Sequence, residues 1–291
     1  MNVAELHGAG KRFGRRWALR HVELSVPAGA VLGLVGPNGA GKTTMLHLLV
    51  GLAAPDEGEV QVFGRRPGTA PVLADIAFVA QDAPLPRRMR LRDLMRACRA
   101  MNERWEPSGV LARIDELQLD VHRRIGTLSG GQRAQIALAL ALAKRPRLLV
   151  LDEPVASLDP LARRGFLSSL MAAVADNELT VVYSTHLLED LERACDHLAV
   201  LAGGELRLDD PIDEALSRHV VIIGPSGRAL PAGAVAVSST VAGSHAEHLV
   251  ALDGAVHDPM WEVRAATLEE IVFAHLADRP TSTAQRLELV P

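Results

Sequence analysis

The sequence predicts an α/β protein whose parallel sheet is covered by helices on both faces, followed by a small α+β domain. Three observations indicate this fold. Short, almost uninterrupted apolar runs alternate with stretches of helical periodicity. One of these runs leads into a glycine-rich turn that opens a helix. After about residue 218 the chain changes to short strand-like runs separated by Gly, Pro and Ser.

The strands of the parallel sheet are expected at short runs rich in Val, Ile and Leu. Nearly continuous apolar runs of this kind are typical of strands that are buried on both faces. They occur at 31–35, 76–80, 147–152 and 179–185. Helices are expected where apolar residues recur at spacings of three and four, at 42–50, 91–101, 130–143, 161–175 and 187–194.

The chain is expected to form two domains, residues 1–218 and residues 219–291. The second has strand-like runs near 220–224, 234–239 and 248–254, and an amphipathic helix at 267–277. The final residues, 278–291, are expected to be a loose tail. No residue in this α+β appendage indicates a particular chemistry.

Composition excludes several classes of protein. Against 31 basic residues there are 35 acidic ones, a formal charge of −4, so no global basic field indicates a dedicated DNA-binding protein. The two cysteines, Cys98 and Cys195, have no C-x-x-C spacing, which predicts free thiols in a reducing compartment. The N-terminus lacks the apolar core of a signal peptide, and the longest apolar run, 136–143, is too short to span a bilayer.

The turn "GPNGAGKT", residues 36–43, fits the pattern G-x-x-x-x-G-K-[ST] between a strand and a helix. Its glycines let backbone N–H groups converge on phosphate oxygens. In this pattern Lys42 supplies charge at the β and γ phosphates, the Thr43 hydroxyl coordinates Mg²⁺, and Thr44 is placed to meet the α-phosphate. The turn therefore predicts a nucleoside triphosphate site.

A second apolar strand, "LLVLDEP" at 148–154, ends in two carboxylates. Ligands of open α/β sheets bind beyond the carboxyl ends of the strands, which places both acids near the phosphate turn. Asp152 is then expected to hold the metal and Glu153 to polarise the attacking water. A GTPase is disfavoured because the sequence contains no N-K-x-D or T-K-x-D run for guanine.

Six motifs together resemble the ATP-binding subunit of ABC transporters across roughly residues 3–218. They are "GPNGAGKTT", Gln81 in "FVAQD", "LSGGQ" at 128–132, "LLVLDEP", "SLD" at 157–159 and His186 in "STH". The resemblance implies a P-loop NTPase core with a helical signature subdomain at about 84–145, and ATP hydrolysis with Mg²⁺. It also implies that two subunits dimerise head to tail, the "LSGGQ" signature of one closing over the ATP of the other.

The resemblance assigns roles by position. It implies that Glu153 is the general base, that His186 holds the γ-phosphate side, and that Lys42 and Gln81 complete the catalytic set. The implied Mg²⁺ ligands are Thr43, Gln81 and Asp152. The implied ATP-binding residues are Phe13, Gly36, Pro37, Asn38, Gly39, Ala40, Gly41, Lys42, Thr43 and Thr44, with Ser129, Gly130, Gly131, Gln132 and Asp159 at the dimer interface.

Some assignments stay open at this point. Phe13 has the place of the adenine-stacking aromatic, with Trp17 as a rival. The arginine-rich segment 84–105 is either a solvated helix face or, by resemblance, a surface that receives the permease. A protein that holds nucleotide without hydrolysing it is a further possibility, which Glu153 and His186 disfavour.

The resemblance implies a partner as well as a reaction. ATP-binding subunits of this family work with a separate transmembrane permease, so this chain is expected to be cytoplasmic and peripheral to the inner face of the cell membrane, with no span of its own and no nucleic acid partner. The pieces "NERWEP" and "TLEEIVFAHL" look more like ATPases of bacterial drug, antibiotic or lipid exporters than like importer subunits. The alternative is a soluble ABC-type ATPase that acts on ribosomes or DNA.

Overall fold

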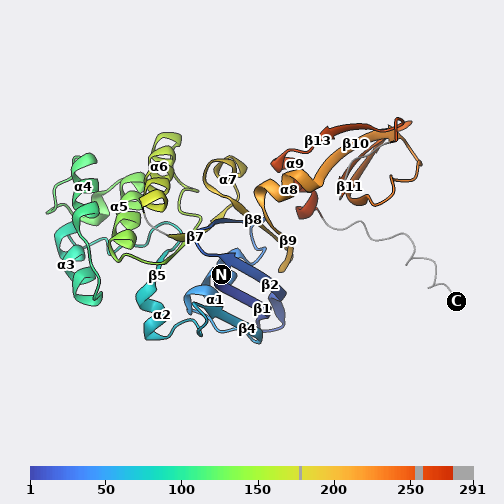
Figure 1. Cartoon of the computed structure of the whole chain (residues 1–291). Helices are drawn as coiled ribbons and strands as arrows, with labels where there is room; N and C mark the ends of the chain where they lie inside the picture. The colour runs from blue at the N-terminus through green and yellow to red at the C-terminus, as the bar shows by residue number, and fades with distance from the viewer. Residues whose placement is uncertain (177–178, 253–257, 278–291) are drawn as a thin grey trace. The chain divides into compact units, whose positions relative to one another are not determined.

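The computed structural model describes residues 1–176, 179–252 and 258–277 (Figure 1). It divides into two compact units, Met1–Asp210 (unit 1) and Pro211–Pro291 (unit 2). Within the described ranges, every helix is too short or too polar to cross a membrane. The expected tail, 278–291, lies outside the described residues.

The centre of unit 1 is a six-stranded sheet in the order β5-β6-β7-β3-β8-β9. The first five strands of this order run parallel. Their registers pair Asp152 with Ser184 and Val35 with Thr185, so several carboxyl ends meet at one edge. The strands are β3 (Val31–Val35), β5 (Ile76–Val79), β6 (Leu148–Asp152), β7 (Thr180–Thr185), β8 (His197–Ala202) and β9 (Glu205–Pro211). The strands predicted near 31–35, 76–80, 147–152 and 179–185 are confirmed.

Both faces of this sheet are buried, which explains the continuous apolar runs. Leu32, Leu34 and Val150 point into a core shared with α1 (Lys42–Val50) and the N-terminal strands. The alternate residues, including Leu149 and Val181, pack against α5 (Gly130–Ala143) and α6 (Pro160–Asp176). The helix α7 (Leu188–Ala194) follows β7 and contributes Ala194 to this second core.

An antiparallel sheet, in the order β2-β1-β4, precedes and flanks the parallel one. Its strands are β1 (Asn2–Phe13), β2 (Arg16–Pro27) and β4 (Glu57–Val62), and the short helix α2 (Ala70–Asp75) leads into β5. These strands were not expected from the sequence. Four register shifts interrupt the pairing of β1 with β2, so the alternation of apolar and polar residues is broken along both strands.

A helical group forms one end of unit 1 (Figure 1). It contains α3 (Leu91–Met101), α4 (Ser108–Glu116), the 3₁₀ turn η1 (Ile125–Thr127) and α5. These elements bury a core of their own, which includes Leu91, Val110 and Ile125. The predicted bounds of α1, α3 and α5 are confirmed.

The described residues of unit 2 form one antiparallel sheet in the order β11-β12-β10-β13 and two helices. From the sequence, the appendage was expected to start at residue 219. Unit 2 begins earlier, at Pro211, because α8 packs against α9. A Thr267–Glu270 capping box starts α9. The elements are α8 (Ile212–Arg218), β10 (His219–Pro225), β11 (Val235–Ala242), β12 (His245–Ala251), β13 (Glu262–Ala265) and α9 (Leu268–Leu276).

Candidate functional site

The glycine-rich turn lies between β3 and α1, where only glycine fits at two positions. A Cβ atom on Gly36 would lie 2.3 Å from the Leu201 carbonyl oxygen, and one on Gly41 would lie 2.5 Å from the Ala18 carbonyl oxygen. Gly41 also has a φ of 111°, which side chains disfavour. The tight turn leaves the N-terminal N–H groups and positive dipole end of α1 available to an anion.

A cavity of about 700 Å³ lies beside this turn. It gathers residues from five separate parts of the sequence: the β1–β2 hairpin, the turn, the loop after β5, the carboxyl end of β6 and the carboxyl end of β7. Its volume is in the range of ligand sites in proteins. The lining residues are Phe13, Arg16, Trp17, Ala18, Pro37, Asn38, Gly39, Gly41, Lys42, Thr43, Thr44, Gln81, Glu153, Ala156 and His186.

The carboxylate of Glu153 lies between two basic side chains. The Lys42 ammonium is 3.0 Å from Glu153 Oε1, and His186 Nδ1 is 3.1 Å from Glu153 Oε2. Lys42 is only 5% exposed and also donates to the Gly36 carbonyl at 2.7 Å. Of the four predicted catalytic side chains, Lys42 and His186 therefore both contact Glu153, whereas Gln81 lines the same cavity. Glu153 gives Lys42 the negative charge that a phosphate would supply.

Asp152 is buried behind the turn and holds two hydroxyl groups. Thr43 Oγ1 donates to Asp152 Oδ2 at 2.9 Å, and Ser184 Oγ donates to Asp152 Oδ1 at 2.8 Å. Ser184 Oγ also accepts the Glu153 N–H at 2.9 Å. Sequence reasoning missed Ser184, whose only signal was a hydroxyl residue at the end of an apolar strand.

Glu153 has an unusual backbone, with a φ of 43° in the left-handed region. A residue with a Cβ atom in this region is strained, and such strain persists only where the surroundings hold it. The contacts of Glu153 to Ser184, Lys42 and His186 provide that hold. They aim the carboxylate into the cavity.

Side chains of β7 and α7 form a buried hydrogen-bond network behind the site. Asp190, which is 1% exposed, accepts the Tyr183 hydroxyl at 2.9 Å and pairs with Arg163 at 2.6 Å. Burial and the neighbouring Asp190 carboxylate raise the pKa of Tyr183, so the phenol stays a donor. The network ties α6 and α7 to β7, the strand that leads to His186.

Both candidate adenine-stacking residues line the cavity. The Phe13 side chain is 61% exposed, as expected of a ring available to a ligand. Lys11 lies 5.8 Å from the Phe13 ring and Arg12 lies 5.8 Å from the Trp17 ring. Arg16, which sequence reasoning did not select, also faces the cavity.

The "LSGGQ" residues lie apart from this cavity. Ser129 caps α5 in a capping box: Ser129 Oγ accepts the Gln132 N–H, and Gln132 Oε1 accepts the Ser129 N–H. A Cβ atom on Gly131 would lie 2.7 Å from Ala162 Cβ, so the helix start approaches α6 closely. Asp159 caps α6 by accepting backbone N–H groups at 3.0 and 2.9 Å. These residues, together with Gly130, do not line the 700 Å³ cavity of their own chain.

The oxygens beside the phosphate turn fit a hard divalent cation. Thr43, Asp152 and Gln81 offer hydroxyl, carboxylate and amide oxygens, which Mg²⁺ prefers together with water and phosphate. Among residues 1–176, 179–252 and 258–277, no three or more His, Cys, Asp or Glu side chains cluster as metal ligands. The donor set therefore favours a cation shared with a nucleotide over a cation held by protein alone.

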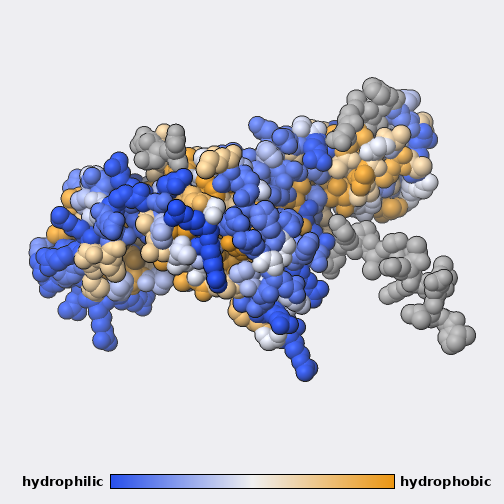
Figure 2. Space-filling model, turned by 60° about the horizontal axis from the view of Figure 1, so that its bottom comes forward, coloured by the Kyte–Doolittle hydropathy of each residue, from blue (hydrophilic) through white to orange (hydrophobic). Residues whose placement is uncertain are grey.

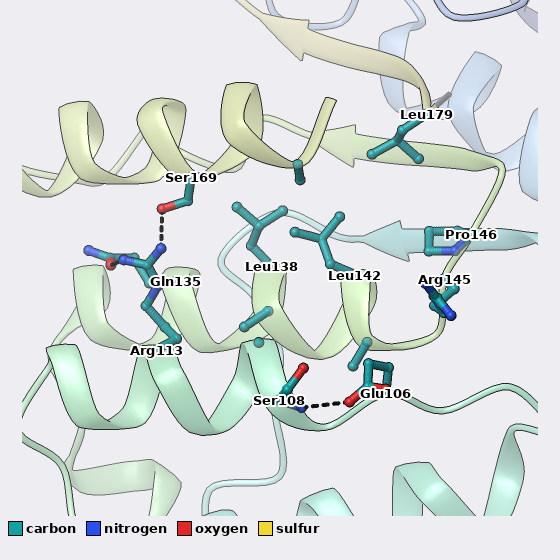
Figure 3. A pocket seen from close by; sticks show the side chains of 14 residues that line it. Glu106, Ser108, Arg113, Gln135, Leu138, Leu142, Arg145, Pro146, Ser169 and Leu179 are labelled. Atoms are coloured by element: carbon teal, nitrogen blue, oxygen red, sulfur yellow. Dashed lines mark hydrogen bonds between the residues drawn. The ribbon is translucent and has the colours of Figure 1, made fainter. Parts of the chain in front are cut away.

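A second cavity, of about 430 Å³, opens between α4, α5 and α6 (Figure 3). Arg113 stands at one end and donates to Gln135 Oε1 at 3.2 Å and to Ser169 Oγ at 2.6 Å. Leu138 and Leu142 form part of its apolar wall. It contains none of the site residues that the sequence predicted.

Comparisons of the sequence with known proteins agree on one family. A family model described as "ABC transporter" matches residues 19–156. The phosphonates import ATP-binding protein PhnC 1 of Natronomonas pharaonis is 38% identical over 72% of this chain and 94% of that protein. The Nod factor export ATP-binding protein I of a Rhizobium species is 33% identical over 74% of this chain and 73% of that protein.

Solved structures share the fold. A structure described as the ATP-binding subunit of an ABC transporter aligns with a TM-score of 0.67 at 24% identity, over 74% of this chain and 92% of the other. A bacterial ABC transporter cassette solved as a dimer aligns with a TM-score of 0.64 at 24% identity, over 72% of this chain and 98% of the other.

Proposed function

This chain belongs to the ABC transporter family as an ATP-binding subunit and is an ATPase, and we propose that it dimerises around two Mg-ATP and powers export through a separate permease. The main support for this site is the contact of Glu153 with both Lys42 and His186 at the wall of the 700 Å³ cavity. Around it lie the phosphate turn and two candidate aromatics.

The phosphate turn is the proposed ATP anchor. The N–H groups at the start of α1 and the Lys42 ammonium bind the β and γ phosphates, and one of the rings of Phe13 and Trp17 stacks on adenine. When the γ-phosphate enters, it takes the place of Glu153 as the partner of Lys42, because both are anions within reach of one ammonium. The freed carboxylate then faces the space beside the terminal phosphate.

Hydrolysis follows from this arrangement. Glu153 accepts the proton of a water that attacks the γ-phosphorus in line with the leaving oxygen. His186, 3.1 Å from Glu153, orients that carboxylate and donates to the phosphate. Thr43, Asp152 and Gln81 are the proposed ligands of Mg²⁺, which would neutralise charge on the phosphates when bound. Positioning and charge neutralisation supply most of the rate.

The dimer follows from the second phosphate-binding turn. Ser129 and Gly131 stand at the N-terminus of α5, a position with free N–H donors and a positive dipole end. They do not reach the cavity of their own chain. We infer that they close over the ATP of a second copy or of a related subunit, with Asp159 at the same interface.

The permease is proposed to dock in a mainly apolar groove of about 530 Å³. Leu94 and Cys98 of α3 and the exposed Leu52 line it, and burial raises the pKa of the Cys98 thiol, which keeps it neutral. Such a groove fits an amphipathic helix of a permease's cytoplasmic loop. In this role the chain lies on the inner face of the membrane without spanning it.

Gln81 connects the groove with the nucleotide. Its side chain lines the ATP cavity, whereas Ala80 and Ala83 on either side line the groove. Asp82 and Ala83 have φ angles of 61° and 42°, so this link is a strained turn that a change at either site would shift. We infer that the occupancy of the ATP site reaches the permease through this turn.

Export is the proposed direction. Both importer and exporter subunits are among the relatives, as the phosphonate and Nod factor proteins illustrate. The proposal of export therefore rests on the resemblance of "NERWEP" and "TLEEIVFAHL" to exporter ATPases. Unit 2, which holds the second of these pieces, is proposed as an accessory domain.

The experiment is co-purification with a polytopic permease, followed by ATP-driven transport in vesicles. Leu52→Glu places a charge in the groove and is expected to abolish recovery of the permease, whereas Leu111→Glu, on exposed α4, is expected to leave it intact. Recovery of ribosomes or DNA instead of a permease would favour the soluble alternative. Accumulation of substrate on the ATP side would contradict export.

A further inference from the structure

Arginine side chains concentrate on the helical group of unit 1. Residues 84–101 and 120–127 together contain eight arginines and two carboxylates, a net charge of +6, in a chain whose formal charge is −4. We call these eight residues, the arginines of 87–99 with Arg123 and Arg124, the arginine surface. Positive charge is therefore concentrated in one part of this chain, although the net charge of the whole chain is negative.

The two segments lie side by side. The Leu91 N–H donates to the Arg123 carbonyl at 3.1 Å, and the Gly126 N–H donates to the Arg87 carbonyl at 2.9 Å. The backbones of Arg90 and Arg124 form an isolated antiparallel β-bridge. The backbone thus holds arginines that are more than 30 residues apart in sequence on one continuous surface.

These arginines face solvent with few internal partners. All eight are exposed, and among the described residues only Arg92 pairs with a carboxylate, that of Asp93 at 3.4 Å. Arg92, Arg96 and Arg99 follow one another at spacings of four and three, on the side of α3 away from its buried leucines. Much of the α3 and α4 region, at the left of Figure 2, is hydrophilic on the face shown.

We propose that the arginine surface binds the anionic phospholipid headgroups of the membrane that carries the permease. Guanidinium groups bind phosphate oxygens through paired N–H donors. A row of arginines along the outer side of a helix suits an extended anionic plane. Met101, 74% exposed at the end of α3, is available to the interfacial region.

The membrane is favoured as the partner because of α3 itself, and this step rests on the proposed permease docking. Leu94 and Cys98 of α3 line the permease groove, while the arginines stand on the same helix. A permease seated in that groove holds α3 close to the bilayer, within reach of its headgroups. Each basic residue near an anionic leaflet adds to the attraction between the protein and the membrane.

The test is co-sedimentation of the full chain with vesicles, without permease. The chain is expected to bind vesicles of phosphatidylcholine with about 30% phosphatidylglycerol and not to bind vesicles of pure phosphatidylcholine. It should be released from the anionic vesicles as the salt concentration approaches 1 M. Replacing Arg92, Arg96 and Arg99 by Gln is expected to weaken binding on the order of 100-fold. The matched control replaces Arg65, Arg66 and Arg193, three exposed arginines outside the surface, and is expected to change binding less than threefold.

Two further measurements separate this proposal from its rivals. ATPase activity without vesicles is expected to be the same in the parental chain and both triple variants, so a loss of lipid binding cannot be a loss of fold or of the ATP site. Absent or salt-independent binding of the parental chain to anionic vesicles would overturn the proposal. So would equal weakening by the control triple variant, or preferential binding of a nucleic acid oligomer or of the permease alone through these arginines.

Discussion

Ser184 gives the sharpest prediction about how the catalytic carboxylates are held. Its side chain is fully buried and joins the Asp152 carboxylate at 2.8 Å to the Glu153 N–H at 2.9 Å. Ser184→Ala leaves both groups without this partner. The Glu153 N–H left unpaired costs about 1–3 kcal/mol, and the lost bond to Asp152, which keeps its bond from Thr43, costs about 1 kcal/mol more, so we expect a loss of about 2–4 kcal/mol in the free energy of unfolding. For a domain of this size that is a fall in Tm of roughly 4–16 °C.

The same change is expected to reach catalysis. Without the Ser184 hydroxyl, the left-handed backbone of Glu153 loses a contact that fixes it, and a misplacement near 1 Å lowers kcat by about 100-fold. The KM for ATP should change little, because the phosphate turn is intact. Steady-state ATPase kinetics and thermal unfolding measure both effects.

Ser169→Ala is the matched control, since it removes the same hydroxyl from a partly buried position in the second cavity. It is expected to cost about 1 kcal/mol or less and to leave kcat unchanged. The reasoning would be refuted if Ser184→Ala kept the parental Tm and kcat, or if Ser169→Ala had the same effect on kcat.

Three further predictions concern the ATP site and unit 2. Lys42→Ala removes a charged donor and is expected to weaken ATP binding about 10- to 100-fold in calorimetry; unchanged affinity would contradict the assignment of the phosphate turn. Of Phe13→Ala and Trp17→Ala, one should weaken ATP binding at least about fivefold and the other should not, and equal small effects would place adenine elsewhere. In unit 2, hydrogen bonds from Arg264 lower the pKa of Glu270 to about 2 from 4.5. This contribution to stability is complete above pH 4.5 and is lost as the pH falls toward 2, so acid should reduce the hydrogen-exchange protection of α9, and less so in Arg264→Gln; identical acid profiles would contradict it.

The parallel core was predictable because its signals are local. The bounds of α1, α3 and α5 follow from periodicity that tertiary contacts do not oppose, and the buried strands follow from continuous apolar runs. The β1–β2 hairpin was not predicted. Its irregular register is fixed by partners in β4 and the α1 core, which no local window contains.

The site was predictable as a set of residues but not as a set of contacts. Sequence identified Lys42, Glu153 and His186, yet it gave no sign that they touch, because that depends on the alignment of β3, β6 and β7. Ser184 was missed for the same reason. It pairs with Asp152 across two strands that are far apart in the chain.

The separation of Ser129 from the cavity also needed the folded chain. From the sequence alone, the N-terminus of α5 could have served the ATP of either copy. The structure makes the two possibilities distinguishable, because a residue that closes over another copy's nucleotide affects association rather than the affinity of a single chain.

The most direct test of the two-copy ATP site is sedimentation of Glu153→Gln variants with Mg-ATP. Asp and Asn both cap a helix as well as Ser does, so Ser129→Asp adds a negative charge opposite the phosphates while keeping α5 intact, and Ser129→Asn is its uncharged control. We expect Glu153→Gln alone and with Ser129→Asn to form an ATP-dependent dimer. With Ser129→Asp the chain should remain monomeric and still bind ATP with parental affinity. A stable dimer in the Asp variant, or loss of ATP binding by its monomer, would contradict the account.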